Sequence, residues 1–245
     1  MKALILAGGR GKRLGEITTS INKCMLPFQG KPVLEYNMQR AVDIAEVDQI
    51  VLVVGHRAED IINKYGISYK GKKIAYVIQS ESKGLVHAID CAKDALGKDD
   101  FFLLLGDEIL INSRHQELIK KFGSENLFAV CGVLFQKEKS KISRTYTVLT
   151  GEDGRIFRLI EKPKRALDNW QGTGHCVFRN EILSYIERTP IHHERSEKEL
   201  PDLIQCAVDD GQLVKIFNIC DEYTNINSGE DLKEAQITIS TKDSI

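Results

Sequence analysis

The sequence predicts an α/β protein: a Rossmann-like three-layer αβα sandwich with a mostly parallel central sheet and a small β appendage in its second half. Three observations lead to this fold class. Short unbroken apolar runs, typical of buried parallel strands, alternate with amphipathic stretches. The 245 residues suffice for one large domain, and we find no linker or repeat in them. A glycine-rich turn follows the first apolar run, where such sheets bind ligands.

The first half of the chain shows a regular alternation of strand and helix patterns. The expected strands, which are short and apolar, are Lys2–Ala7, Gln49–Val54, Lys73–Ile78 and Phe101–Leu105. The expected helices, which repeat apolar residues at helical spacing, are Pro32–Ala45, Ala58–Tyr65, Gly84–Leu96 and Arg114–Phe122. This rhythm indicates βαβ units, with helices covering both faces of the sheet.

The second half of the chain has a more mixed pattern. A turn over residues 151–154 separates two strand patterns, Tyr146–Leu149 and Ile156–Glu161, and indicates a hairpin. The other expected strands are Phe128–Leu134, Gly174–Phe178 and Val214–Ile219. The other expected helices are Asn180–Ile186, Glu199–Val208 and Gly229–Ile239. We expect residues 1–245 to form a single domain.

Composition and charge exclude several classes of function. The formal net charge is -1, whereas nucleic-acid and anionic-membrane binders usually carry a basic excess, so we expect neither partner. No apolar run approaches the ~20 residues that span a bilayer. The six cysteines are scattered and lack the spacing of a zinc site, which is typical of reduced thiols in a cytoplasmic protein.

The glycine-rich segment after the first strand is the most distinctive local feature. Glycine backbones approach phosphate oxygens closely, and basic side chains add charge, so the segment predicts a phosphate site. Its expected nucleotide-binding residues are Leu6, Ala7, Gly8, Gly9, Gly11, Lys12 and Arg13. Two common alternatives fail on register: a dinucleotide fingerprint needs glycine at Leu14, and a Walker loop needs Gly-Lys where Arg13-Leu14 stands.

Together with the next twenty or so residues, this segment resembles the opening signature of the sugar-phosphate nucleotidylyltransferases. The matching stretch is LAGGRGKRLGEIT over residues 6–18, followed by Lys23, by Leu26-Pro27 and by Gly30-Lys31-Pro32. Three positions depart from the family pattern: Lys12 replaces Thr or Ser, and Glu16 and Asn22 replace prolines. These departures concern the shape of the loop more than its chemistry.

Further motifs of the same family occur later in the chain, in the same order. The resemblance implies that Gln79 and Gly84 contact the base, that Gly106-Asp107 binds a metal, and that Glu161-Lys162-Pro163 binds the sugar phosphate. It also implies that the segment containing Gly174 lines the acceptor pocket. We therefore expect a nucleotide-binding half over about residues 1–110 and an acceptor-binding half over about residues 111–240.

The implied reaction is in-line attack of an acceptor phosphate on the α-phosphorus of a nucleoside triphosphate, with release of pyrophosphate. Because two anions must meet, the site mainly has to position and neutralise charge. The resemblance assigns this work to Arg13, Lys23, Asp107 and Lys162. Glu161 would bind a hydroxyl of the acceptor, and Mg²⁺ would bridge Asp107 and the triphosphate.

The second metal ligand has two candidates. Counting from the late acidic motif of the family places it at Asn225, whereas related cytidylyl- and uridylyltransferases place it two positions later, at Asn227. Either asparagine supplies a neutral carbonyl oxygen in place of a carboxylate. The sequence does not decide which of the two asparagines is the second metal ligand.

Two other functions are compatible with the residues. One is a cytidylyltransferase acting on a non-sugar acceptor such as a phosphocholine-like molecule. The other is a catalytically silent nucleotide-binding subunit, which we expect to have lost at least one of the four catalytic residues, whereas all four are present. The sequence leaves the base open, and it is compatible with a monomer or a homo-oligomer.

Overall fold

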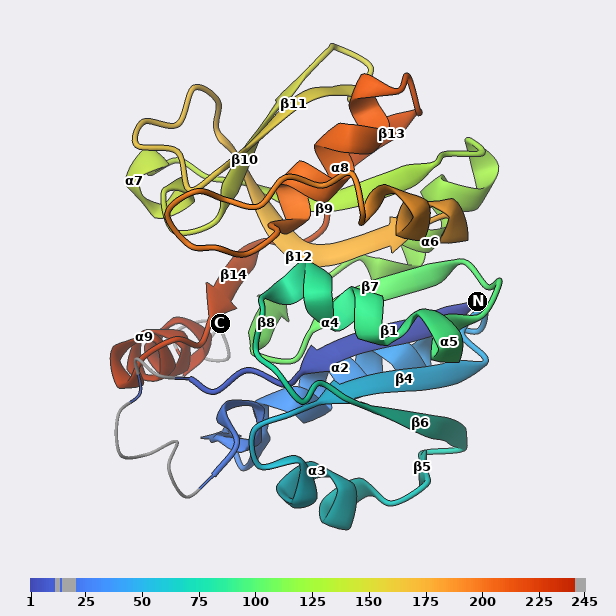
Figure 1. Ribbon diagram of the computed structural model, residues 1–245. Coiled ribbons are helices and arrows are strands. Elements are labelled where there is room, and N and C mark those ends of the chain that lie inside the picture. The colour runs from blue at the N-terminus through green and yellow to red at the C-terminus, as the bar shows by residue number, and fades with distance from the viewer. Residues whose placement is uncertain (12–13, 15–20, 241–245) are drawn as a thin grey trace.

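Four parallel strands form the centre of the main sheet. The computed structural model describes residues 1–11, 14 and 21–240 (Figure 1). The order of the parallel strands is β7 (Phe101–Leu105), β1 (Lys2–Ala7), β4 (Gln49–Val54) and β6 (Lys72–Ile78). The short strand β5 (Ser68–Tyr69) pairs antiparallel with β6. Parallel pairing places the carboxyl ends of these strands along one edge, where side chains from distant segments meet.

The second half of the chain continues the same sheet with mainly antiparallel pairing. The long strand β12 (Trp170–Phe178) pairs with β7, with β9 (Ala129–Phe135) and with β10 (Tyr146–Thr150). Strand β11 (Ile156–Glu161) completes the expected hairpin with β10, and β13 (Val214–Asn218) runs parallel to β9. The register of β12 against β9 shifts between Gly172 and Cys176, so β12 bulges there.

Helices cover both faces of the sheet (Figure 1). One face packs against α2 (Val33–Asp43), α3 (Ala58–Tyr65) and α6 (His115–Ser124). The other face packs against α4 (Leu85–Cys91), α5 (Lys93–Leu96), the 3₁₀ segment η3 (Asn180–Tyr185) and α8 (Leu200–Asp209). Alternate residues of β1 enter the two cores, since Leu4 lies in one and Ile5 in the other.

A smaller layer lies at the carboxyl edge of the sheet. It contains the two-stranded sheet of β8 (Glu108–Ile111) and β14 (Glu222–Asn225), the hairpin of β2 (Pro27–Phe28) and β3 (Lys31–Pro32), and α9 (Gly229–Ser240). The 3₁₀ segment η2 (Lys23–Met25) precedes β2, and the short helix α7 (Lys139–Ile142) precedes β10. A third apolar cluster joins α9 to β8 and to the β2–β3 hairpin.

The predicted α/β fold class, with helices on both sides of a central parallel sheet, is confirmed. The expected helix Gly84–Leu96 is interrupted, because Ala92 donates its N–H to Ile89, three residues back, instead of four. Strands β8 and β14 were not predicted. Within the described ranges, no helix is long and apolar enough to cross a membrane.

Candidate functional site

The turn after β7 places Asp107 at the carboxyl edge of the sheet. The Gly106 N–H donates to the carbonyl of Leu6 at 2.9 Å. A Cβ at Gly106 would lie 3.0 Å from that carbonyl oxygen and 3.1 Å from Cys24 Sγ, so any other residue would push these neighbours apart by a few tenths of an ångström. The Asp107 carbonyl in turn accepts the N–H of Ile226 at 2.9 Å. The aspartate is therefore fixed between β7 and the segment after β14.

Asn22, one of the three positions that depart from the family pattern, positions Lys23. Its buried side chain donates to the carbonyls of Ala7 at 3.1 Å and His56 at 2.7 Å, and its Oδ1 accepts the N–H of Cys24 at 2.8 Å. The asparagine thus caps η2 and ties it to the end of β1. Proline would fix the backbone at this position, whereas asparagine fixes it by hydrogen bonds.

Three of the predicted residues meet at one point. The Lys23 ammonium contacts Asp107 Oδ2 directly and lies 3.4 Å from Asn227 Oδ1. The Lys23 and Asp107 side chains are only 10% and 16% exposed, so little water screens their attraction. Asn225 Oδ1 accepts from Asn227 Nδ2 at 2.8 Å, which turns Asn227 Oδ1 toward Lys23. Asp231 caps the backbone of Asn227 at 2.8 Å.

The predicted base-contacting residues also lie together. Gln79 is buried, and its Nε2 donates to the Gly84 carbonyl at 3.2 Å and lies 3.0 Å from His87 Nδ1. A Cβ at Gly8 would lie 2.8 Å from Gln79 Oε1, so the first loop and the start of α4 meet at this glutamine. Leu6 and Ala7 are buried at the end of β1, and Gly9 is exposed.

The structure describes the glycine-rich loop as far as Gly11. This residue adopts a left-handed φ of 61°, and its carbonyl accepts the N–H of Leu14 at 2.8 Å. The next two predicted residues, Lys12 and Arg13, lie outside the described residues. The roles expected of these two basic side chains stay predictions of the sequence.

A cavity of about 170 Å³ joins the metal and acceptor candidates. Its lining includes residues predicted for the acceptor and for the metal, namely Glu161, Lys162, Gly174, Asn225 and Asn227. It also includes Arg144, Glu199 and Tyr223, which the sequence analysis did not identify. Segments more than 60 residues apart thus form one concave site.

Charges gather at the acceptor end of this cavity. Lys162 Nζ lies 2.9 Å from Glu161 Oε1, and an Arg195 nitrogen lies 3.9 Å from the same oxygen. Burial raises the pKa of Glu161, although the nearby Lys162 ammonium acts in the opposite direction. Arg195 has a buried Nη2 without a hydrogen-bond partner among the described residues. This Nη2 is the nitrogen that lies 3.9 Å from Glu161 Oε1, and Arg195 is not among the residues that line the cavity, so its charge acts on the site through Glu161.

Glu108 is a buried residue of the cavity lining that holds two other lining residues in place. Its carboxylate accepts the Gly174 N–H at 2.9 Å and the Tyr223 hydroxyl at 2.7 Å, and lies 3.3 Å from His175 Nε2. Burial, reinforced by this carboxylate, raises the pKa of Tyr223 well above its usual range, so the phenol stays protonated as a donor. A Cβ at Gly174 would lie 2.1 Å from Leu105 Cγ, so the bulge of β12 requires glycine.

Within the part of the chain that the structure describes, Asp107 and Asn227 offer a metal hard oxygen ligands. Among the described residues, no group of three or more His, Cys, Asp or Glu side chains forms a metal cluster. Asp107 and Asn227 nevertheless direct two oxygens at the same cation, the Lys23 ammonium. Two such oxygens fit Mg²⁺, which takes one or two protein ligands together with phosphate and water oxygens.

Sequence reasoning missed Arg144, Arg195 and Tyr223 because no local pattern marks them. Arg195 lies in a polar loop 34 residues after Glu161, and only folding brings the two together. Tyr223 lies on a strand of four residues that is too short for a periodic signal. Asn22 was visible in the sequence as a departure, but its capping role follows only from its hydrogen bonds.

The fold and the cavity describe an α/β protein with a concave, charged site at the carboxyl edge of its sheet. The nucleotidyl transferase family model matches residues 2–235. The chain therefore belongs to the nucleotidyl transferase family, and the predicted transferase activity is confirmed.

Two relatives illustrate the range of the family. The low-salt glycan biosynthesis nucleotidyltransferase Agl11 of Haloferax volcanii is 33% identical over 246 residues, which cover 99% of this chain and 67% of the relative. The UTP–glucose-1-phosphate uridylyltransferase AglF of the same organism is 30% identical over 236 residues, which cover 96% and 95%. A crystal structure of UDP-glucose pyrophosphorylase complexed with UDP-glucose has the same fold, with a TM-score of 0.87, 21% identity and 98% coverage of both chains.

Proposed function

We propose that the protein transfers a nucleotidyl group from a nucleoside triphosphate to a sugar 1-phosphate and releases pyrophosphate. The observation that carries this proposal is that one cavity is lined by both Asn227 and Lys162. Asn227 in turn lies next to Lys23, which contacts Asp107. An anion held by Lys162 would face the phosphate held near Lys23. The relative AglF, a UTP–glucose-1-phosphate uridylyltransferase, supports a sugar 1-phosphate as the acceptor.

The triphosphate would bind over the first loop. The proposed contacts are the backbone and side chains of Leu6, Ala7, Gly8, Gly9, Gly11, Lys12 and Arg13, with Gln79 and Gly84 at the base. Gln79 supports this role because its amide is fixed between Gly84 and His87, which leaves its Oε1 beside Gly8. An amide that is already fixed loses less entropy when it binds a base, and its donor and acceptor keep one direction.

The acceptor phosphate would bind at Lys162, which lines the cavity and supplies an ammonium. Arg195 is not among the lining residues, and its Nη2 lies 3.9 Å from Glu161 Oε1. Glu161 would accept a hydroxyl of the sugar, and the backbone at Gly174 would form the floor. On binding, the phosphate would compete with Glu161 for Lys162, so the ion pair would rearrange.

The proposed nucleotidyl transfer requires no covalent intermediate between the enzyme and the nucleotide. A phosphate oxygen of the acceptor forms a bond to the α-phosphorus while the bond to the bridging oxygen breaks, and its electron pair leaves with pyrophosphate. Lys23 would stabilise charge on the α-phosphate as the bonds exchange. Mg²⁺, when bound, neutralises the phosphate charge and acts as a Lewis acid. Asp107 and Asn227 would hold it, and Asn225 would orient the Asn227 amide.

A pyrophosphate-release screen tests this function. UTP, dTTP, CTP and GTP are each combined with glucose 1-phosphate, other sugar 1-phosphates and phosphocholine, in the presence of Mg²⁺. We expect turnover with at least one sugar 1-phosphate, and product analysis by mass spectrometry identifies the nucleotide sugar. Turnover with phosphocholine alone would replace the sugar assignment. Nucleotide binding without any turnover would contradict the catalytic assignment.

The cytoplasmic location stays a prediction from the scattered cysteines.

A further inference from the structure

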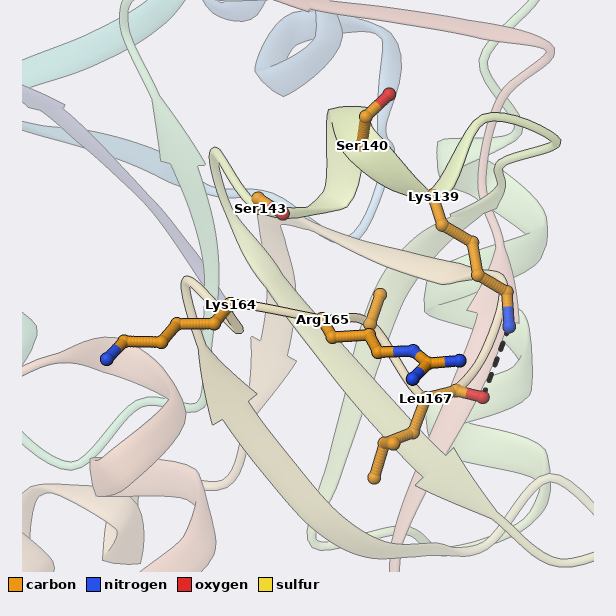
Figure 2. Close-up of a pocket in the computed structure, with 7 residues that line it drawn as sticks. Lys139, Ser140, Ser143, Lys164, Arg165 and Leu167 are labelled. Carbon is orange, nitrogen blue, oxygen red and sulfur yellow. Dashed lines mark hydrogen bonds between the residues drawn. The ribbon is translucent and has the colours of Figure 1, made fainter.

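A cavity of about 430 Å³ outside the proposed site has no converging set of donors. It lies between α7 and the segment that joins β11 to β12. Ser140, Lys164 and Arg165 of its lining point in different directions (Figure 2). These side chains would not contact one small ligand together. The polar side chains that the proposed reaction leaves without a role lie instead in the core, behind the acceptor cavity.

Two histidines in the core form a chain of contacts toward Glu108. His115 of α6 and His175 of β12 are buried, and His115 Nε2 lies 2.9 Å from His175 Nδ1. On the other side of its ring, His175 Nε2 lies 3.3 Å from Glu108 Oε2, which is an electrostatic contact without full hydrogen-bond alignment. Phe102 packs against both imidazoles. Burial of two imidazoles in apolar surroundings costs stability, so the pair calls for an explanation beyond packing.

The surroundings of the pair determine where its protons lie. Burial, reinforced by the neighbouring His175 ring, lowers the pKa of His115 well below its usual range, so His115 is neutral. Its Nδ1 is buried and has no hydrogen-bond partner among the described residues. Because a buried N–H without a partner is rarer than a bare acceptor, the His115 proton belongs on Nε2, which donates it to His175 Nδ1. The proton of His175 is then on Nε2, where it faces the Glu108 carboxylate.

Glu108 connects this pair to the acceptor cavity. Its Oε2 accepts the Gly174 N–H at 2.9 Å, and its Oε1 accepts the Tyr223 hydroxyl at 2.7 Å. The main chain of Glu108 is held separately, because its carbonyl accepts from Asn37 at 2.9 Å. Gly174 and Tyr223 line the cavity, whereas neither histidine is among the lining residues. The histidines can therefore affect the cavity only through the orientation of the carboxylate.

The orientation of this carboxylate decides what Tyr223 offers to a ligand. While the phenol donates its proton to Glu108, its oxygen presents only lone pairs to the cavity and can accept from a sugar hydroxyl. A carboxylate that turned away would release the phenol to rotate. Side chains that hold a binding residue in one rotamer preserve affinity, although they do not touch the ligand themselves.

We propose that His115 and His175 are positioning residues for the acceptor. They fix the Glu108 carboxylate, which fixes the Tyr223 hydroxyl as a hydrogen-bond acceptor on the wall of the cavity. This role rests on the proposed function, because it concerns affinity for the acceptor. Loss of the pair should weaken acceptor binding without disturbing Lys23 and Asp107.

Two amide substitutions of His175 test this role. A glutamine amide lies as many bonds from Cβ as Nε2 does, whereas an asparagine amide lies as many bonds from Cβ as Nδ1 does. His175→Gln should therefore keep a donor toward Glu108, with an acceptor KM within about threefold of wild type. His175→Asn keeps only the side toward His115 and should raise this KM about tenfold, with kcat within about twofold of wild type.

The matched control is the same pair of substitutions at His193. This histidine is 84% exposed and does not line the cavity, so neither variant should change the acceptor KM. A KM for His175→Asn no higher than that for His175→Gln would overturn the positioning role. An effect of His175→Asn confined to kcat would also overturn it.

Tyr223→Phe tests the route from the histidines to the cavity. Removal of the hydroxyl should raise the acceptor KM about tenfold, and His175→Asn should add little to this in the double variant, because both act through one group. Full additivity of the two effects would overturn the route through Tyr223. If His175→Asn does not fold, as judged by circular dichroism, an unchanged KM in Tyr223→Phe would overturn the same route.

Nuclear magnetic resonance of protein labelled with nitrogen-15 histidine tests the buried contact without any acceptor. The His175 signals, identified by their loss in His175→Gln, should show a protonated Nε2. An Nε2 without a proton would overturn the proposal, because it would repel the carboxylate. If no acceptor is turned over, the proposed function fails, while the spectrum still decides whether His175 directs a proton at Glu108.

Discussion

Two lysine–carboxylate pairs occupy the two ends of the site, and they differ in burial. Lys23 and Asp107 are both largely buried, and Asn227 adds a third polar group. In the other pair, Glu161 is 11% exposed whereas Lys162 is 41% exposed. The first pair joins segments 84 residues apart, and the second pair consists of neighbours in sequence.

This difference indicates how each end binds its phosphate. The Lys23 end is organised before a ligand arrives, because packed backbone contacts fix both partners. At the Lys162 end, the ammonium is partly hydrated and can leave Glu161 for an anion at small cost, since exposed ion pairs contribute little. We therefore expect changes at the first end to reduce turnover, and changes at the second end to reduce acceptor affinity.

Asp107→Asn should produce the largest effect. It removes the carboxylate that contacts the Lys23 ammonium, so turnover should fall by roughly 10²–10³ or more. Steady-state kinetics with saturating substrates measure this, and circular dichroism checks the fold. Asp221→Asn is the matched control, because Asp221 belongs to an exposed pair with Arg114 and should leave turnover unchanged. Equal rates for Asp107→Asn and wild type would remove Asp107 from the site.

Lys162→Gln should mainly raise the KM for the acceptor, by roughly 10–100-fold, because it removes a charge-assisted contact to the phosphate. The Kd of the nucleotide should stay within about twofold of wild type, as measured by calorimetry. Lys137→Gln, at an exposed lysine that does not line the acceptor cavity, is the control for loss of one surface charge. A defect confined to nucleotide binding would show that the two ends have been assigned in the wrong order.

Asn227→Ala and Asn225→Ala separate the two candidate metal ligands. Asn227 faces the shared cation position, whereas Asn225 acts through the Asn227 amide. The Mg²⁺ concentration for half-maximal rate should rise about tenfold in Asn225→Ala, the lower end of outer-shell effects, and more in Asn227→Ala. A larger rise in Asn225→Ala would reverse the assignment.

Glu161→Gln should have a small effect on stability that depends on pH. Because burial raises the pKa of Glu161 in the folded state, ionisation of this carboxyl costs stability as the pH rises through that pKa. The glutamine variant avoids this cost. Its Tm should exceed that of wild type at pH 7, by less than ~4 °C, the shift that about 1 kcal/mol causes in a protein of this size. The two Tm values should converge below the ordinary glutamate pKa of 4.5. A difference in Tm between variant and wild type that grows toward low pH would contradict the raised pKa of Glu161.

The two ends also differ in how far the sequence predicts them. Strands β1, β4 and β7 and the turn at Gly106-Asp107 follow from local apolar runs and glycines, because parallel strands bring their ends together without further information. The acceptor wall depends on the bulge of β12 against the antiparallel strand β9 and on the Glu108–Gly174 hydrogen bond, which joins residues 66 apart in the sequence. Such register shifts are set by tertiary packing and leave no periodic signal.

The central claim is that Lys23, Asp107 and Asn227 form one site for a metal-bound triphosphate. Electron paramagnetic resonance of Mn²⁺, used in place of Mg²⁺, tests it most directly. Each sample contains a non-hydrolysable analogue of the triphosphate that the screen identifies. Wild type should hold Mn²⁺ in a ternary complex, with the nucleotide present, and Asp107→Asn should leave it in solution or bound to nucleotide alone. An unchanged ternary spectrum in Asp107→Asn would contradict the claim.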